Sequence, residues 1–360
     1  MITSAYIHIP FCNSLCHYCD FCKIKYDEKK VDEYLDVLEK EIKKNYKGEV
    51  LKTIYIGGGT PSSLSLNQLE KLFEIIDLFE RKNAEITFEI NCESIDLKKL
   101  KFLKKKVNRL SFGVQTFDDE LLRYLGRNHS SEMAIEKIKE AFLIGFDNIS
   151  VDLIYGIKNQ TTQGLKKDLD IIKDLRIPHV STYSLMLKKG TNFFESENYI
   201  EEDLEFEMYN LVCSELSEYS HYEISNFGKK NYFSKHNLVY WNNEQYYGFG
   251  MGASGYVGDV RYKNSENFID YVNGLRDEEV LSLNEVIQNE FILGLRKTEG
   301  ISLEKFEKKF NFSFLKLDFI KELIEEGKLI FENDHLKIPD KYLYISNDIL
   351  VNFMVDYEQS

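Results

Sequence analysis

The amino-acid sequence predicts an α/β protein with a parallel sheet, followed by a smaller α+β domain. Six short runs rich in β-forming residues occur in the first 190 residues, and amphipathic helical stretches separate most of them. Strands that alternate with helices in this way are typical of a parallel sheet. From about residue 195 the alternation stops, which indicates that a different kind of structure begins there.

The predicted elements of the first part can be placed from the sequence pattern. The strands are expected at residues 4–9, 52–57, 85–90, 109–114, 148–156 and 179–186. Helices are expected at 32–46, 66–80 and 202–219, and either Ser65 or Asn67 is placed to cap the second of them.

The last 80 residues show a second pattern. From about residue 280 the sequence indicates a helix, a loop and a second helix, and then a helix that runs into a two-stranded hairpin. This order predicts a small winged-helix-like domain. The chain carries a net charge of −14 and has a pI near 5.2, whereas binding to phosphate backbones needs a basic surface. We therefore expect no nucleic-acid partner.

The location of the protein is also suggested by the sequence. The N-terminus lacks the pattern of a signal peptide, and no apolar run approaches the roughly 18 residues that a membrane span needs. We expect a cytoplasmic protein without stable membrane insertion. In that compartment clustered cysteines are more often metal ligands or redox groups than disulfides.

Polar and sulfur-bearing side chains follow five of the predicted strands. Cysteines follow the first, GGGTPS (57–62) the second, NCES (91–94) the third and QTF (115–117) the fourth, while Asp152 and Tyr155-Gly156 close the fifth. The carboxyl ends of parallel strands meet at one edge of a sheet. We therefore expect these groups to share one rim.

Four of the six cysteines lie in the stretch FCNSLCHYCDFC (11–22). A zinc site using all four thiols is the less favoured alternative, because closed zinc sites usually pair cysteines across a long spacer. Iron–sulfur clusters accept compact runs, and Cys12, Cys16 and Cys19 could bind three corners of a [4Fe-4S] cluster. One iron would then stay open, and Cys22 would be an extra thiol. Cys92 and Cys213 are expected to be small buried residues.

The motifs of this chain resemble those of a known superfamily. C-x3-C-x2-C with an aromatic residue, Tyr18, before the third cysteine resembles the signature of radical S-adenosylmethionine (SAM) proteins. YIHIPFC and DF narrow the resemblance to the family of oxygen-independent coproporphyrinogen III oxidase and the related HemW-type heme chaperones. IGGGTPS, RLSFGVQTF, LGRNH, SVDLIYG and HNLVYW extend it over essentially the whole chain.

The resemblance implies a fold and a division of the chain. The fold would be a partial (β/α)6 TIM-like barrel, followed by a smaller C-terminal domain. Residues 1–225 would form the radical SAM barrel, and residues 226–278, rich in aromatic residues and glycine, would complete it. Residues 279–360 would form a HemN-type C-terminal domain.

The resemblance also implies cofactors and the residues that bind them. Cys12, Cys16 and Cys19 would hold a [4Fe-4S] cluster, and SAM would chelate the open iron through its amino and carboxylate groups. Contacts to SAM are implied for Tyr6, Tyr18, Gly58, Gly59, Thr60, Glu89, Gln115, Arg127 and Asp152. Taken singly, these polar residues are also compatible with ordinary strand ends. The family usually has proline where this chain has Cys92 and Lys158, neither of which is an implied ligand.

Two positions bear on the choice between chaperone and enzyme. The oxidase carries a further cysteine two residues after the third, where this chain has Phe21. HNLVYW (236–241) matches the HNxxYW motif of the heme chaperones, so His236 is a candidate axial ligand of heme. The alternative is that His236 and Asn237 only order a loop. We expect a heme chaperone that passes heme to an unidentified acceptor protein and has no catalytic residues. A radical SAM enzyme such as the oxidase is the second interpretation.

Overall fold

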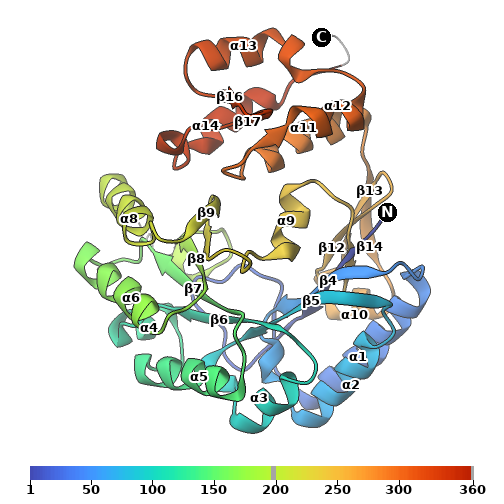
Figure 1. Cartoon of the computed structure of the whole chain (residues 1–360). Coiled ribbons are helices and arrows are strands. Elements are labelled where there is room, and N and C mark those ends of the chain that lie inside the picture. Colours follow the sequence, from blue (N-terminus) through green and yellow to red (C-terminus); the bar gives the residue numbers. More distant parts are fainter. Residues whose placement is uncertain (196–199, 358–360) are drawn as a thin grey trace.

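A nine-stranded sheet lies at the centre of the computed structural model, which describes residues 1–195 and 200–357. The strands follow the order β11-β1-β4-β5-β6-β7-β8-β10-β9, and helices cover the outer side of the sheet (Figure 1). Those from β11 to β8 run parallel, while β10 and β9 are antiparallel. Their bounds are β1 (Ser4–Ile9), β4 (Leu51–Gly58), β5 (Arg81–Ile90), β6 (Arg109–Gln115), β7 (Ile149–Tyr155), β8 (His179–Ser184), β9 (Ser220–Glu223), β10 (Asn226–Gly228) and β11 (Tyr247–Phe249).

The six predicted strands are all present and lie side by side in chain order, which confirms the predicted parallel α/β fold. The sequence pattern missed β11, which pairs in parallel with β1 and belongs to the aromatic and glycine-rich segment. A strand of three residues is too short to show a period of two. Gly248 in this strand leaves no room for a side chain, since a Cβ there would lie 1.8 Å from the carbonyl oxygen of Ser254.

The helices between the strands mostly begin at a residue whose side chain caps the first turn. They are α1 (Glu28–Asn45), α2 (Leu66–Ile76), α3 (Leu97–Leu103), α4 (Asp119–Leu125), α5 (Ser131–Ile144), α6 (Thr162–Asp174), α7 (Asn192–Glu195) and α8 (Glu202–Glu215). Of the two candidate caps of α2, Ser65 is the N-cap and forms a capping box with Gln68. This helix ends at Ile76 rather than at residue 80, because the chain must turn before β5 begins at Arg81.

The HNLVYW segment forms a short helix, α9 (Lys235–Trp241), which is fixed to the sheet by Glu85 of β5. One carboxylate oxygen of Glu85 accepts hydrogen bonds from the backbone N–H groups of Lys235, at 3.0 Å, and His236, at 3.3 Å. Two smaller pairings accompany it: a sheet of β12 (Ser254–Val257), β13 (Val260–Asn264) and β14 (Arg276–Val280), with α10 (Phe268–Val272), and the pair β2 (Phe11–Cys12) and β3 (Ile24–Lys25).

The C-terminal part has the predicted order of helices and hairpin, and it lies on the α9 side of the sheet (Figure 1). Its elements are α11 (Leu283–Gly294), β15 (Ile301–Ser302), α12 (Leu303–Phe310), α13 (Asp318–Glu325), β16 (Ile330–Glu332), β17 (His335–Lys337) and α14 (Ser346–Leu350). Lys297 donates a hydrogen bond to Asn242, next to α9, at 2.7 Å. In the part of the chain that the structure describes, no helix is long and apolar enough to cross a membrane.

Candidate cofactor site

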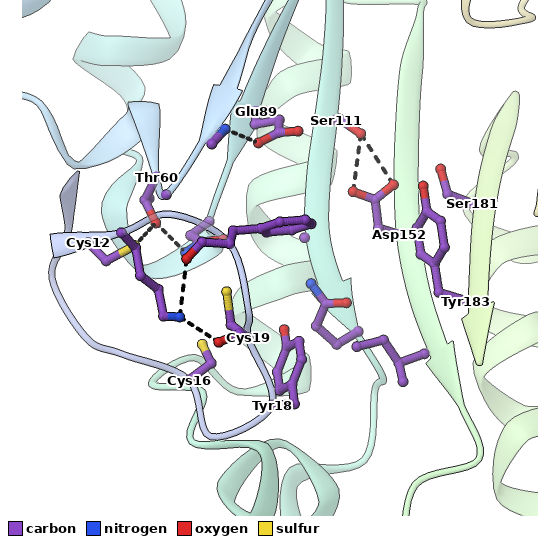
Figure 2. Close-up of a pocket in the computed structure, with 18 of the residues that line it drawn as sticks. Cys12, Cys16, Tyr18, Cys19, Thr60, Glu89, Ser111, Asp152, Ser181 and Tyr183 are labelled. Atoms are coloured by element: carbon purple, nitrogen blue, oxygen red, sulfur yellow. Dashed lines mark hydrogen bonds between the residues drawn. The ribbon is translucent and has the colours of Figure 1, made fainter. Parts of the chain in front are cut away.

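A cavity of about 500 Å³ opens among the loops at the carboxyl ends of the central strands. It is lined by almost all of the residues that the sequence singled out, namely Cys12, Cys16, Tyr18, Cys19, Gly58, Gly59, Thr60, Glu89, Gln115, Arg127 and Asp152. The cysteine sulfurs lie on one side, while Asp152, Ser181 and Tyr183 lie on the opposite side (Figure 2). The predicted shared rim is therefore present.

The cysteine loop is closed at its base by the pairing of β2 with β3, in which Phe11 pairs with Ile24. Lys23 stabilises the loop, because its ammonium group donates a hydrogen bond to the carbonyl oxygen of Cys19 at 2.5 Å. Cys22 is not among the described residues that line the cavity. A Cβ placed on Gly252 would come within 2.6 Å of its sulfur, so the Cys22 thiol packs against that glycine instead.

Two of the three cavity thiols accept hydrogen bonds from neighbouring side chains. The hydroxyl of Thr60 donates to the sulfur of Cys12 at 3.4 Å, and the guanidinium of Arg127 donates to the sulfur of Cys16 at 3.5 Å. Burial raises the pKa of Cys12 to about 11, although the bond from Thr60 acts in the opposite direction. Burial also raises the pKa of Cys19. Without metal these two thiols keep their protons, and metal binding would release them.

The thiols fit a cluster better than a single ion. Among residues 1–195 and 200–357, no group of three His, Cys, Asp or Glu side chains converges closely enough to hold one metal ion. Three free thiols still line one cavity, and the irons of a [4Fe-4S] cluster are spread over a wider volume than one ion. With the thiol of Cys22 packed elsewhere, a zinc site using all four cysteines has no support.

The glycine run that follows β4 is required by the packing of the protein itself. A Cβ on Gly57 would lie 2.7 Å from the carboxyl carbon of Glu89, and one on Gly58 would lie 2.7 Å from the ring of His8. At Gly59 the nearest atoms belong to the Pro10 backbone, at 2.8 Å. Gly58 and Gly59 also line the cavity, so their contact with SAM stays a prediction, although no side chain would fit at either position.

Two partly buried acids face the cavity. Glu89 accepts hydrogen bonds from the Tyr55 hydroxyl at 2.8 Å and from the Gly58 N–H at 3.0 Å. Burial raises the pKa of Glu89 to about 7, although the bond from Tyr55 opposes the shift. Asp152 accepts from the Ser111 hydroxyl at 3.3 Å, and burial raises its pKa as well. Such acids are suited to accept hydrogen bonds from a ligand's hydroxyl or ammonium groups.

An amide and a cation complete the rim beside the cysteine loop. Gln115 ends β6 in the left-handed region, with φ of 72°, and this backbone conformation is uncommon for a residue other than glycine. Arg127 donates to the side-chain oxygen of Asn91 at 2.9 Å and to the carbonyl oxygen of Gly113 at 2.6 Å. These bonds hold the guanidinium between the carboxyl ends of the strands and the thiol of Cys16.

Two of the predicted residues lie apart from this cavity. Tyr6 is absent from its described lining, and its hydroxyl is hydrogen-bonded to His8 at 2.8 Å. His236 is 1% exposed, and both of its ring nitrogens are engaged at 2.8 Å, one with Thr53 and one with Tyr240. In this conformation no nitrogen of His236 is free to bind iron. Its role as a heme ligand stays a prediction, and the observed contacts favour the alternative that it orders the segment.

Several lining residues were missed by the motif analysis. They are Tyr55, Asn91, Arg109, Ser111, Ser181, Tyr183, Met186 and Asn237. A signal for some of them was present in the sequence, because side chains two residues apart on a strand share a face. Once Gln115 is placed on the rim, the period of two brings Ser111 and Arg109 of β6 to the same side. Asn237 lies on α9, and the strand pattern gives no indication of its position.

Comparisons with known proteins agree with this geometry. The family model of the Radical SAM superfamily matches residues 6–172, and that of the HemN C-terminal domain matches residues 281–341. A protein named Heme chaperone HemW from Lactococcus lactis is 40% identical over 370 residues, which cover 98% of this chain and 97% of the relative. A protein of the same name from Bacillus subtilis is also 40% identical and covers 98% of this chain and 99% of the relative.

The chain belongs to the HemW family of radical SAM proteins. Its fold is shared by the radical SAM enzyme coproporphyrinogen III oxidase (HemN) from Escherichia coli, with a TM-score of 0.86 at 22% identity. The two chains superpose over 98% of this chain and 90% of the oxidase. At this level of identity the likeness establishes the fold alone. Membership of the HemW family agrees with the HNxxYW motif found in the sequence.

Proposed function

We propose that this protein is a heme chaperone of the cytosol, which binds heme and passes it to an acceptor protein. The observation that carries the proposal is the 40% identity, over nearly the full length of both chains, to proteins named heme chaperones. The exposed apolar side chains at the cavity add support. Phe21 is 66% exposed and Met186 is 64% exposed, and both line the cavity. Exposed apolar groups of this kind suit a flat macrocycle.

The proposed cofactors are a [4Fe-4S] cluster and SAM. Cys12, Cys16 and Cys19 would hold the cluster, because their free thiols line one cavity and membership of the family implies this cofactor. SAM would bind in the same cavity, against the residues that the resemblance implies. Glu89 and Asp152 would accept hydrogen bonds from its polar groups, and Arg127 would hold the loop of Cys16 in place. The role of Tyr6 would be indirect, since its hydroxyl is bonded to His8.

The proposed division of the chain follows the expected boundaries. Residues 1–225 would form the cofactor barrel, and residues 226–278 would complete it through β11 and α9. Residues 279–360 would form the domain that docks the acceptor or covers the site; the match to the HemN C-terminal domain lies within this range.

A parallel assay separates the chaperone from the oxidase. The protein is reconstituted anaerobically with iron and sulfide and divided into two samples. One is titrated with hemin, and the other is incubated with coproporphyrinogen III, SAM and a reductant. We expect a shifted Soret band at a stoichiometric amount of hemin and no protoporphyrinogen IX. Formation of protoporphyrinogen IX, or the absence of any Soret shift, would contradict the proposal.

A further inference from the structure

The cavity extends far beyond the cysteine loop, along the whole of β6. It is lined by Arg109, Ser111, Gly113 and Gln115, which are alternate residues from the first to the last position of that strand. Six residue steps in an extended strand span roughly 20 Å. The residues implied to hold SAM gather at the carboxyl end, which leaves the amino end, with Arg109, without an assigned ligand.

Arg109 is a buried cation with few partners. It is 2% exposed, and a guanidinium carries five N–H groups. The hydrogen bond of this side chain within the described residues is a long one, 3.3 Å, to a ring nitrogen of His179. Its Nε atom is buried without a partner, and no carboxylate of the described chain forms an ion pair with it. Buried N–H groups without acceptors are costly, so this guanidinium would be stabilised by an anion that accepts hydrogen bonds from it.

The acids nearest to Arg109 are engaged elsewhere. Glu85 accepts the two backbone N–H groups that open α9, and Glu89 accepts from Tyr55 and Gly58. Asp152 accepts from the hydroxyl of Ser111. Burial raises the pKa of all three acids, and the charge of Arg109 opposes this shift, most strongly at Glu85. The three carboxylates therefore interact electrostatically with the guanidinium, but they accept no hydrogen bond from its N–H groups.

We propose that Arg109 and Asn237 form a subsite for the carboxylate of a bound ligand. Asn237, on α9, is the member of the HNLVYW motif that lines the cavity, whereas His236 is turned into hydrogen bonds with Thr53 and Tyr240. A guanidinium can bind both oxygens of a carboxylate, and an amide can donate to one of them. The carboxylate is that of a heme propionate, which rests on the proposed function, because the carboxylate of SAM is implied to lie on the open iron at the other end of the cavity.

The experiment compares variants of the full-length, reconstituted protein. Arg109→Gln removes the charge, and Arg109→Lys retains it without the planar fork. Arg296→Gln is the matched control, because Arg296 also has a buried Nε atom without a partner and does not line the cavity. Affinities are measured for hemin, for hemin dimethyl ester, which has no free carboxylate, and for SAM. We expect Arg109→Gln to weaken binding of hemin at least about tenfold and to leave binding of the dimethyl ester and of SAM unchanged.

The outcomes test whether the carboxylate is a heme propionate. Weaker binding of hemin with unchanged binding of its ester and of SAM supports a propionate subsite, whereas weaker binding of SAM with unchanged binding of hemin overturns it. Arg109→Gln protein that binds both ligands as tightly as the wild type overturns the proposal. If wild-type protein binds no hemin, the proposed function fails and this subsite fails with it, whereas hemin binding that Arg109→Gln leaves unchanged overturns the subsite alone. If Arg109→Gln does not fold, Asn237→Ala replaces it, and unchanged affinities for both ligands again overturn the proposal.

Discussion

Replacing His236 by leucine tests whether this residue is a structural element or a heme ligand. The imidazole is buried and joins Thr53 to Tyr240 through two hydrogen bonds of 2.8 Å. Leucine keeps much of the volume but leaves the two hydroxyl groups without their partner. A buried polar group left unpaired costs about 1–3 kcal/mol. Thr53 is buried and Tyr240 is partly exposed, so we expect a total loss of about 2–4 kcal/mol.

The same substitution should change the pH dependence of stability. Burial lowers the pKa of His236 to about 3, and the charge of Arg109 contributes to this shift. In the unfolded chain His236 has an ordinary histidine pKa and binds a proton as the pH falls. In the folded protein its imidazole stays neutral over the same range. The wild type therefore loses stability as the pH falls through the unfolded value. Between about pH 7.5 and about pH 5.5, this effect lowers the free energy of unfolding of the wild type by roughly 1 kcal/mol. The difference in free energy of unfolding between the wild type and His236→Leu should narrow by the same amount.

The assay is urea denaturation at both pH values, combined with a hemin titration of each protein. His335→Leu is the matched control, because His335 lies on the C-terminal hairpin, partly exposed, and should change stability by less than about 0.5 kcal/mol. We expect His236→Leu to lose stability while the Soret band of bound hemin stays at the wild-type position. A variant of unchanged stability that no longer shifts the Soret band would refute this reasoning and make His236 a heme ligand.

Three further predictions concern the cysteines, the buried acid and a tight turn. Serine at any position of the C-x3-C-x2-C triad should abolish most iron and sulfide binding, whereas Cys22→Ser should leave the measured iron content unchanged, since this thiol lies outside the cavity lining. The pKa of Glu89 is raised to about 7, so its carboxyl group lowers the stability of the fold increasingly as the pH rises from about 5 to about 7. Denaturation curves of Glu89→Gln should lack this decline, which is worth roughly 2 kcal/mol over that range. Gly300→Ala places a Cβ 2.1 Å from the carbonyl oxygen of Leu336 and should lower the melting temperature more than Gly327→Ala, where the same atom meets open space.

The central sheet could be predicted because each of its six long strands carries its own signal. Strands buried on both faces appear as nearly continuous apolar runs, and helices separate them at regular intervals. The rim followed from one geometric rule, that the carboxyl ends of parallel strands meet at a single edge. Cys12, Thr60 and Asp152 are far apart in the sequence, and this rule brought them into one cavity.

The remaining features depend on contacts that no local pattern contains. His236 and Thr53, which are hydrogen-bonded, are separated by 183 residues. The partners of an imidazole decide whether it can bind a metal, and one of the two partners of His236, Thr53, lies on β4 near the start of the chain. The glycine run at the end of β4 is a similar case. The residues that pack against it, Glu89, His8 and Pro10, come from other parts of the chain, and no local pattern identifies them.

The short helix α9 connects the barrel, the cavity and the C-terminal part, which the sequence pattern predicted as separate units. Its first turn is held by Glu85 of β5, and Asn237 lines the cavity. Just beyond its last residue, Asn243 donates hydrogen bonds to the carbonyl oxygen of Val286 at 3.2 Å and to Glu290 at 3.1 Å, both on α11. One helical segment therefore contacts the barrel, the cavity and the C-terminal part. A change in the HNLVYW motif would act on all three, so its effect on heme binding has to be separated from its effect on stability before any residue of the motif is named a ligand.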